Sequence, residues 1–183
     1  MTSAPQEERE VLVFDATCLS HFARADRLDV LRGLLSADEC WTTQVVLQEL
    51  RKGTGEHPAL ELVTEGNWLS VAEFDTPAKA ILFAEWARRI GAEDRDFGEA
   101  SVFAVAELQG GIPVTDDRRA VAIARARGLA VHGTIWLLAR ACRDGKLSEP
   151  GASSLIDALR ETGHRLPCTG TEFPNFARRY KLL

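Results

Sequence analysis

Short apolar runs alternate with helical segments along most of the chain. The runs "VLVF" (11–14), "ECWTT" (39–43), "WLSVAEF" (68–74) and "IPVT" (112–115) have the length of strands, and "LAVHG" (129–133) is expected to be a fifth. A continuous apolar run such as "VLVF" is typical of a parallel strand that is buried on both faces. The alternation therefore predicts an α/β protein with a three-layer α/β/α fold and a central parallel sheet of about five strands.

The segments between these runs carry the spacing and the end signals of helices. Residues 17–35 have apolar residues at helical spacing, and Pro77 and Gly91 stand at the start and the end of another helix. Segment 97–111, "FGEASVFAVAELQGG", is almost wholly apolar, so it predicts a buried helix.

Length and composition indicate one compact domain. The 183 residues are 45% hydrophobic and 27% charged, which suits a single core. We expect residues 1–9 to be disordered, residues 10–146 to form the α/β domain, and residues 147–183 to add a C-terminal helical extension packed on it. No apolar run approaches the roughly 20 residues of a membrane span. The four cysteines and four histidines are scattered, which argues against a zinc site and favours a cytoplasmic location.

Four acidic residues stand where a solvated surface position is not expected. Asp15 directly follows "VLVF", and Asp117, next to Asp116, follows "IPVT". Glu49 lies near the buried side of a predicted helix, and Glu99 lies in the first turn of the apolar helix. Because parallel strands end at one edge of a sheet, these acids are expected to converge there. Singly, each has a simpler explanation as a helix cap, an ion-pair partner or a group attracted by a helix dipole.

A cluster of carboxylates at a buried edge requires a cation, because each ionised group raises the pKa of the others. Oxygen ligands favour Mg²⁺ or Mn²⁺, and such an ion on carboxylates typically activates water or binds phosphate. Neighbouring residues that leave a strand point to opposite sides. We therefore expect Asp117 to face the metal, and Asp116 to cap the helix that starts at Arg118 or to interact with the N-terminal dipole of that helix. The net charge of −5 excludes a general DNA-coating protein but not a nucleic-acid enzyme.

These segments resemble the four acidic motifs of PIN-domain ribonucleases. The matching stretches are "VLVFDATCL", "VVLQEL", "DFGEASVFAVAEL" and "IPVTDDRRAVAIARARGL", and the 18 residues from Glu99 to Asp117 fit the usual gap in that family. Further stretches, including "LIDALRETGHRLP", are similar to a bacterial and archaeal PIN-like branch of predicted nucleic-acid-binding proteins. The resemblance covers about residues 10–166.

The resemblance implies Mg²⁺- or Mn²⁺-dependent hydrolysis of RNA by a parallel sheet packed between helices. It places Asp15, Glu49, Glu99 and Asp117 at the catalytic, metal-binding positions, and Thr17 and Thr115 at supporting hydroxyl positions. Since many relatives have Asp where this chain has Glu99, Asp96 is a further candidate ligand, as is Asp116. Among the basic residues near the site, Arg118 and Arg119 are the candidate RNA contacts.

The leading expectation is a metal-dependent endoribonuclease that acts as the toxin of a toxin–antitoxin pair. RNA would then be the substrate, and a small antitoxin protein and a second copy of the chain are candidate partners; no membrane partner is expected. The alternative is a non-catalytic RNA- or protein-binding module on the same fold. An aspartyl-phosphate phosphatase or a receiver domain fits less well, because the former requires a second Asp where Thr17 stands and the latter reverses the order of the acids.

Overall fold

The computed structural model describes residues 10–92 and 96–183. The predicted disordered segment, residues 1–9, lies outside the described residues. Within them, one fully parallel sheet has the strand order β3-β2-β1-β4. The strands are β1 (Val11–Phe14), β2 (Glu39–Thr43), β3 (Ser70–Ala72) and β4 (Ile112–Val114). The central strand β1 is the most buried, since Leu12, Val13 and Phe14 have no exposed surface.

The predicted fifth strand, residues 129–133, is reduced to one bridge. His132 pairs with Val114 in the parallel sense, and the amide of Thr115 donates to the His132 carbonyl at 2.9 Å. The pairing stops there because α8 begins at Thr134, directly after Gly133. The described sheet therefore has four strands, and the segment 129–133 only extends its β4 edge.

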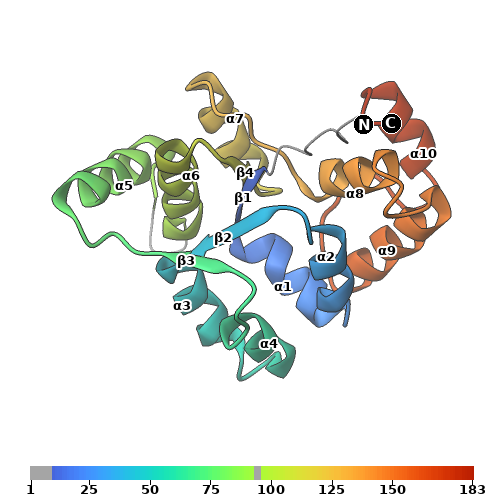
Figure 1. Cartoon of the computed structure of the whole chain (residues 1–183), viewed down its shortest axis with the longest axis horizontal. Helices are drawn as coiled ribbons and strands as arrows, with labels where there is room; N and C mark the ends of the chain where they lie inside the picture. Colours follow the sequence, from blue (N-terminus) through green and yellow to red (C-terminus); the bar gives the residue numbers. More distant parts are fainter. Residues whose placement is uncertain (1–9, 93–95) are drawn as a thin grey trace, which may run out of the picture.

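Helices cover both faces of the sheet, which confirms the predicted three-layer fold (Figure 1). Above the sheet in that view lie α5 (Pro77–Ile90), α6 (Phe97–Gln109) and α7 (Arg118–Ala126), and α6 packs against β1, β2 and β4. Below the sheet lie α1 (Ala16–Arg24), α2 (Leu28–Leu34), α3 (Gln44–Gly53), the 3₁₀ turn Pro58–Leu60 and α4 (Glu61–Thr64).

The helix predicted over residues 17–35 is divided into α1 and α2. Asp26 has φ of 55°, in the left-handed region that ends a helix, and aspartate tolerates this region better than most residues do. The amide of Arg27 then donates to the Phe22 carbonyl at 2.9 Å and closes the last turn of α1.

The C-terminal part of the chain forms α8 (Thr134–Arg143), α9 (Glu149–Glu161) and α10 (Phe173–Arg179), which group on the right in Figure 1. These three helices contact one another, and their buried residues belong to the same hydrophobic core as the sheet. In the described part of the chain, no helix combines the length and the apolar character that crossing a membrane would demand.

The connections bring four helix starts to one edge of the sheet. α1 and α3 begin directly after β1 and β2, and α7 begins after β4. Since α6 runs back along the sheet to the start of β4, its first turn lies at the carboxyl edge as well. Strand order reverses direction at β1, with β2 on one side and β4 on the other, and open α/β sheets bind their ligands at such a point.

Candidate active site

Asp15 lies at the end of β1 and is almost completely buried, with 1% of its surface exposed. It caps α1, because its Oδ1 accepts a hydrogen bond of 2.6 Å from the amide of Ala16. Its Oδ2 accepts a bond of 3.0 Å from the hydroxyl group of Thr115. Burial raises the pKa of Asp15, although hydrogen bonds from Thr115, Ala16 and Thr17 oppose that shift.

The Thr115 hydroxyl connects two of the predicted acids. It donates to Asp15, and it accepts a hydrogen bond of 3.3 Å from the amide of Asp117. Thr115 is 1% exposed, so the hydroxyl is held in the interior between β1 and the turn after β4. Both predicted supporting hydroxyls, Thr17 and Thr115, thus hydrogen-bond to Asp15.

Glu49 projects from α3 towards the first turn of α6. Its Oε1 accepts a hydrogen bond of 3.0 Å from the amide of Gly98. The carboxylate occupies the space beside Gly98, since a Cβ atom at that position would lie 3.0 Å from Glu49 Cδ. Burial and the nearby charge of Asp15 raise the pKa of Glu49 to about 7.

Glu99 is half-buried in the first turn of α6 and interacts with the other three acids. Burial raises its pKa to about 8, and the negative charges of Asp15, Glu49 and Asp117 add to the shift. The four acids predicted from the sequence therefore act on one another electrostatically in the folded chain. This group of Asp15, Glu49, Glu99 and Asp117 is called the acidic cluster below.

Within the doublet of Asp116 and Asp117, the residue that caps α7 is not the one expected. Asp117, not Asp116, caps α7, because its Oδ1 accepts a bond of 2.6 Å from the amide of Ala120. Asp116 points to the other side of the turn, where its oxygens contact Thr134 and His164. Burial of Asp116 opposes its ionisation, but the interaction with His164 and the hydrogen bonds from Thr134 outweigh this effect and lower its pKa. The prediction that Asp116 is the cap was wrong, because the short turn after β4 lets Asp117 serve both the helix and the acidic edge.

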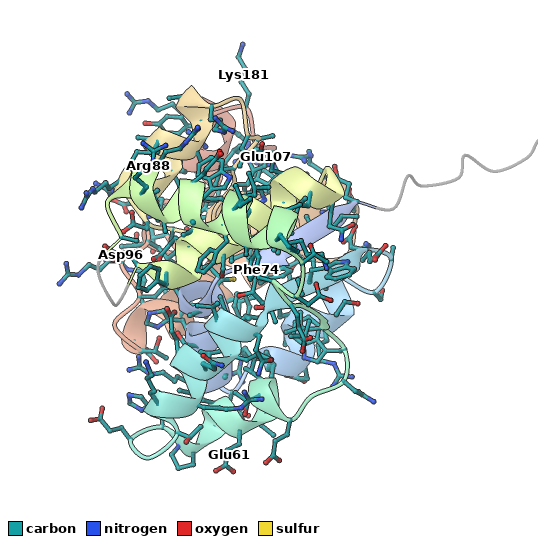
Figure 2. The ribbon with its side chains drawn as sticks, turned by 90° about the vertical axis from the view of Figure 1, so that its left-hand side faces the viewer. Glu61, Phe74, Arg88, Asp96, Glu107 and Lys181 are labelled. Atoms are coloured by element: carbon teal, nitrogen blue, oxygen red, sulfur yellow. The ribbon has the colours of Figure 1, made fainter. Side chains whose placement is uncertain are left out.

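A cavity of about 370 Å³ opens beside the acidic cluster. Its lining residues are Ile90, Asp96, Glu99, Asp117, Arg119 and Ala120. Figure 2 looks onto the side of α5 and α6, with Asp96 near the left edge. The cavity therefore contains two members of the acidic cluster, the additional acid predicted from the sequence and one arginine.

Arg119 is held at the cavity by the end of α5. Its Nη2 donates a hydrogen bond of 3.0 Å to the carbonyl oxygen of Ile90. Arg118 is exposed beside it. Two other basic residues, Arg125 in α7 and Arg127 at its C-cap, serve the fold. Arg125 donates to the Val131 carbonyl at 2.9 Å, and Arg127 contacts Glu107, which is labelled in Figure 2.

A buried hydroxyl pair supports the start of α6 and was missed in the sequence. Thr43 Oγ1 lies 2.7 Å from Ser101 Oγ, which donates to the Gly98 carbonyl at 2.6 Å. Thr43 also caps α3 by accepting from the amide of Val46. The signals for this pair were a threonine between a strand and a helix, and a single serine in an apolar helix.

The donor chemistry of the acidic cluster fits a hard divalent cation. The groups are carboxylates only, and none of Asp15, Glu49 and Glu99 forms an ion pair with a described basic residue. Glu49 Oε2 and Asp117 Oδ2 accept no hydrogen bond from residues 10–92 or 96–183. As the described side chains stand, however, no group of three or more His, Cys, Asp or Glu encloses a metal position.

The fold and this edge define a three-layer α/β/α protein with an acidic site at the carboxyl ends of parallel strands. The family model DUF3368, a PIN domain, matches residues 11–171, and the chain belongs to the PIN-domain family. This match confirms the family resemblance predicted from the sequence, and PIN domains are generally nucleases. The comparisons with curated proteins and with solved structures gave no significant match.

Proposed function

We propose that this protein is a divalent-metal-dependent ribonuclease whose active site is the acidic cluster. The observation that carries the proposal is the convergence of four carboxylates, from β1, α3, α6 and the start of α7, on one edge of the sheet. Such an arrangement is unfavourable without a cation, as the raised pKa values of Glu49 and Glu99 indicate. Membership of the PIN-domain family supports nuclease chemistry at this edge.

The acidic cluster would hold Mg²⁺ or Mn²⁺, with Asp96 as a further candidate ligand at the cavity. Asp116 is less suited to this role, because both of its oxygens already accept hydrogen bonds from Thr134. When bound, such an ion lowers the pKa of water and neutralises charge on a phosphate group.

The protein's own residues orient the acids and the substrate. Thr115 and Ala16 fix the two oxygens of Asp15, and the Gly98 amide fixes one oxygen of Glu49. Arg119 presents a guanidinium group at the cavity, where it would bind the phosphate next to the cleaved bond. Arg118 is exposed on the same turn and would bind a neighbouring phosphate.

We further propose a cellular role, which is based on the resemblance to toxin-related PIN domains. The protein would act in the cytoplasm as the toxin of a toxin–antitoxin pair, with a small antitoxin protein as its partner. A homodimer is the proposed oligomeric state. Co-purification with the product of a neighbouring short reading frame, followed by light scattering of each form, tests both partners.

The catalytic proposal is tested by incubating the full chain with total RNA and Mn²⁺, alongside Asp15→Asn. We expect the wild type to cleave RNA and the variant to be inactive while it remains folded. Cleavage by both proteins would place the activity elsewhere.

A non-catalytic RNA-binding module is the second candidate. The observation that favours it is the internal hydrogen bonding of Asp15, Glu49 and Asp117, with no preformed metal enclosure among the described residues. In that case the wild type would bind RNA without cleaving it, and Asp15→Asn would bind equally well.

A further inference from the structure

Asp116 is the centre of a second polar network, on the side of the β4–α7 turn that faces away from the cavity. Its Oδ1 accepts a hydrogen bond of 3.0 Å from the amide of Thr134, and its Oδ2 accepts one of 2.6 Å from the hydroxyl of Thr134. The side chain leaves no room for a Cβ atom at Gly133, which would collide with Asp116 Oδ1. This carboxylate is therefore fixed by the start of α8.

His164, beyond the end of α9, completes the contacts of Asp116. Its Nε2 lies 3.0 Å from Asp116 Oδ2, and its side chain is 2% exposed. The two atoms are in ion-pair contact, but the geometry at Nε2 is not that of a hydrogen bond. Both ring nitrogens of His164 are buried without a hydrogen bond of good geometry among the described residues, so the contact of Nε2 with Asp116 is the polar contact that offsets the burial of the ring.

The ring of His164 is held by His21 of α1. The two rings stack with centroids 4.2 Å apart and 9° between their planes. His21 Nδ1 lies 2.6 Å from Thr162 Oγ1, and that hydroxyl donates to the Leu159 carbonyl at 2.6 Å. Because the hydroxyl has one proton, His21 Nδ1 must carry the proton that it shares with Thr162. The C-terminal segment is thereby tied to α1 and to the turn after β4.

Asp116 connects this polar network to the acidic cluster through its two neighbours in the chain. Asp116 lies between Thr115, which fixes Asp15, and Asp117, which lines the cavity and caps α7. A shift of Asp116 would move both neighbours through the backbone. Active sites are sensitive to such shifts, since a displacement of about 1 Å can reduce the rate on the order of 100-fold.

We propose that His164 is a positioning residue, which acts through Asp116 to hold Thr115 and Asp117 in place at the acidic cluster. The expected effect of His164 on kcat rests on the proposed nuclease function, whereas its expected effect on the order of the β4–α7 turn does not. It assigns a role to the segment after α9, which lies far in sequence from the four acids.

The test compares three variants of the full chain. His164→Leu removes the polar contact with Asp116, and His164→Gln keeps an N–H group at about the place of Nε2. Ile156→Val is the matched control, because Ile156 is a fully buried residue of α9 that loses packing but no hydrogen bond. For each protein we would measure the melting temperature, kcat and KM for RNA cleavage with Mn²⁺, and hydrogen exchange of the amides in residues 114–122.

We expect His164→Leu to lower kcat by about 10- to 100-fold with little change in KM, and to accelerate exchange in residues 114–122. His164→Gln should restore most of both properties, and Ile156→Val should change neither. Equal exchange in the wild type and His164→Leu would overturn the proposal. So would a loss of kcat in Ile156→Val that matches the loss in His164→Leu at the same change in melting temperature. If the wild type cleaves no RNA, the proposed function fails, and the exchange comparison still decides the positioning role.

Discussion

The hydroxyl group of Thr115 donates a hydrogen bond of 3.0 Å to the buried carboxylate of Asp15, across the pairing of β4 with β1. This bond joins Asp15, the first residue of the acidic cluster along the chain, to the strand end that carries Asp117, the last one. Since the same hydroxyl accepts from the amide of Asp117, one side chain sets the relative position of two strand ends.

Thr115→Val should therefore impair both stability and cleavage. The substitution keeps the shape of the side chain but leaves a buried carboxylate oxygen without its donor, which costs about 1–3 kcal/mol. We expect a kcat reduced by at least about tenfold, because Asp15 is no longer held. Thr42→Val is the control, since Thr42 is equally buried but donates to the Phe14 carbonyl. Denaturation curves and cleavage rates should show a loss of stability in both variants and a loss of kcat in Thr115→Val alone.

Gly98→Ala should displace Glu49. A Cβ atom on Gly98 would lie 2.5 Å from Glu49 Oε2, which is closer than real Cβ contacts. Alanine has a higher helix propensity than glycine by about 1 kcal/mol, so the substitution favours the helix while it displaces the Glu49 carboxylate. The comparison is Gly33→Ala in α2, where nothing lies within 4 Å of the new Cβ atom. We expect Gly33→Ala to raise the melting temperature and keep Mn²⁺ affinity, and Gly98→Ala to weaken Mn²⁺ binding. Unchanged affinity in Gly98→Ala would show that Glu49 is not a ligand.

The two functions of Asp117 should separate by substitution. Asn and Asp are comparable helix caps, whereas Ala costs about 1 kcal/mol at that position. Asp117→Asn should therefore keep the melting temperature of the metal-free protein and lose most cleavage, because it removes a charge from the cavity. Asp117→Ala should lose both cleavage and stability. Full activity of Asp117→Asn would show that Asp117 caps α7 but does not take part in catalysis.

Stability without metal should fall as the pH rises from 6.5 to 8.0. The folded-state pKa values of Glu49 and Glu99, about 7 and 8, lie above their unfolded values near 4.5. The folded chain therefore holds protons that the unfolded chain has already released, and this stabilisation is lost as the pH passes the folded pKa values. The loss should be on the order of 1 kcal/mol after allowance for partial exposure to solvent.

His21 does not affect the stability between pH 6.5 and 8.0, because its pKa is lowered to about 4 and its contribution changes only below pH 6.5. Denaturant titrations at several pH values would measure the slope, and Glu99→Gln should flatten it. A slope that is identical in Glu99→Gln would contradict the assignment of the raised pKa to Glu99.

The strand ends could be predicted from the sequence because burial on both faces leaves a continuous apolar run, and an acid directly after it is conspicuous. That reasoning found Asp15 and Asp117, and Glu99 followed from an acidic residue in the first turn of a mostly apolar helix. The order of the strands and the proximity of Glu49 to Gly98 depend on packing between distant segments, so the sequence predicted that Glu49 lies near the buried side of its helix but not which group it contacts.

The roles of the doublet could not be read from alternation along a strand. Asp116 is held inside by His164 and Thr134, and neither partner is marked by any local pattern near "TDD". The fifth strand failed for a similar reason, since "LAVHG" has a strand-like composition but is ended by the start of α8 at Thr134. In both cases the start of α8 at Thr134 overrode the local signal.

The measurement that tests the central claim most directly is calorimetric titration of the metal-free protein with Mn²⁺ at pH 7, in buffers of different ionisation enthalpy. If the acidic cluster binds the ion, Glu49 and Glu99 must lose the protons that their raised pKa values retain. We predict saturable binding with release of about one proton per ion, and less proton release in Glu99→Gln. An absence of binding at millimolar Mn²⁺, or binding with no proton release, would contradict a metal site formed by these carboxylates.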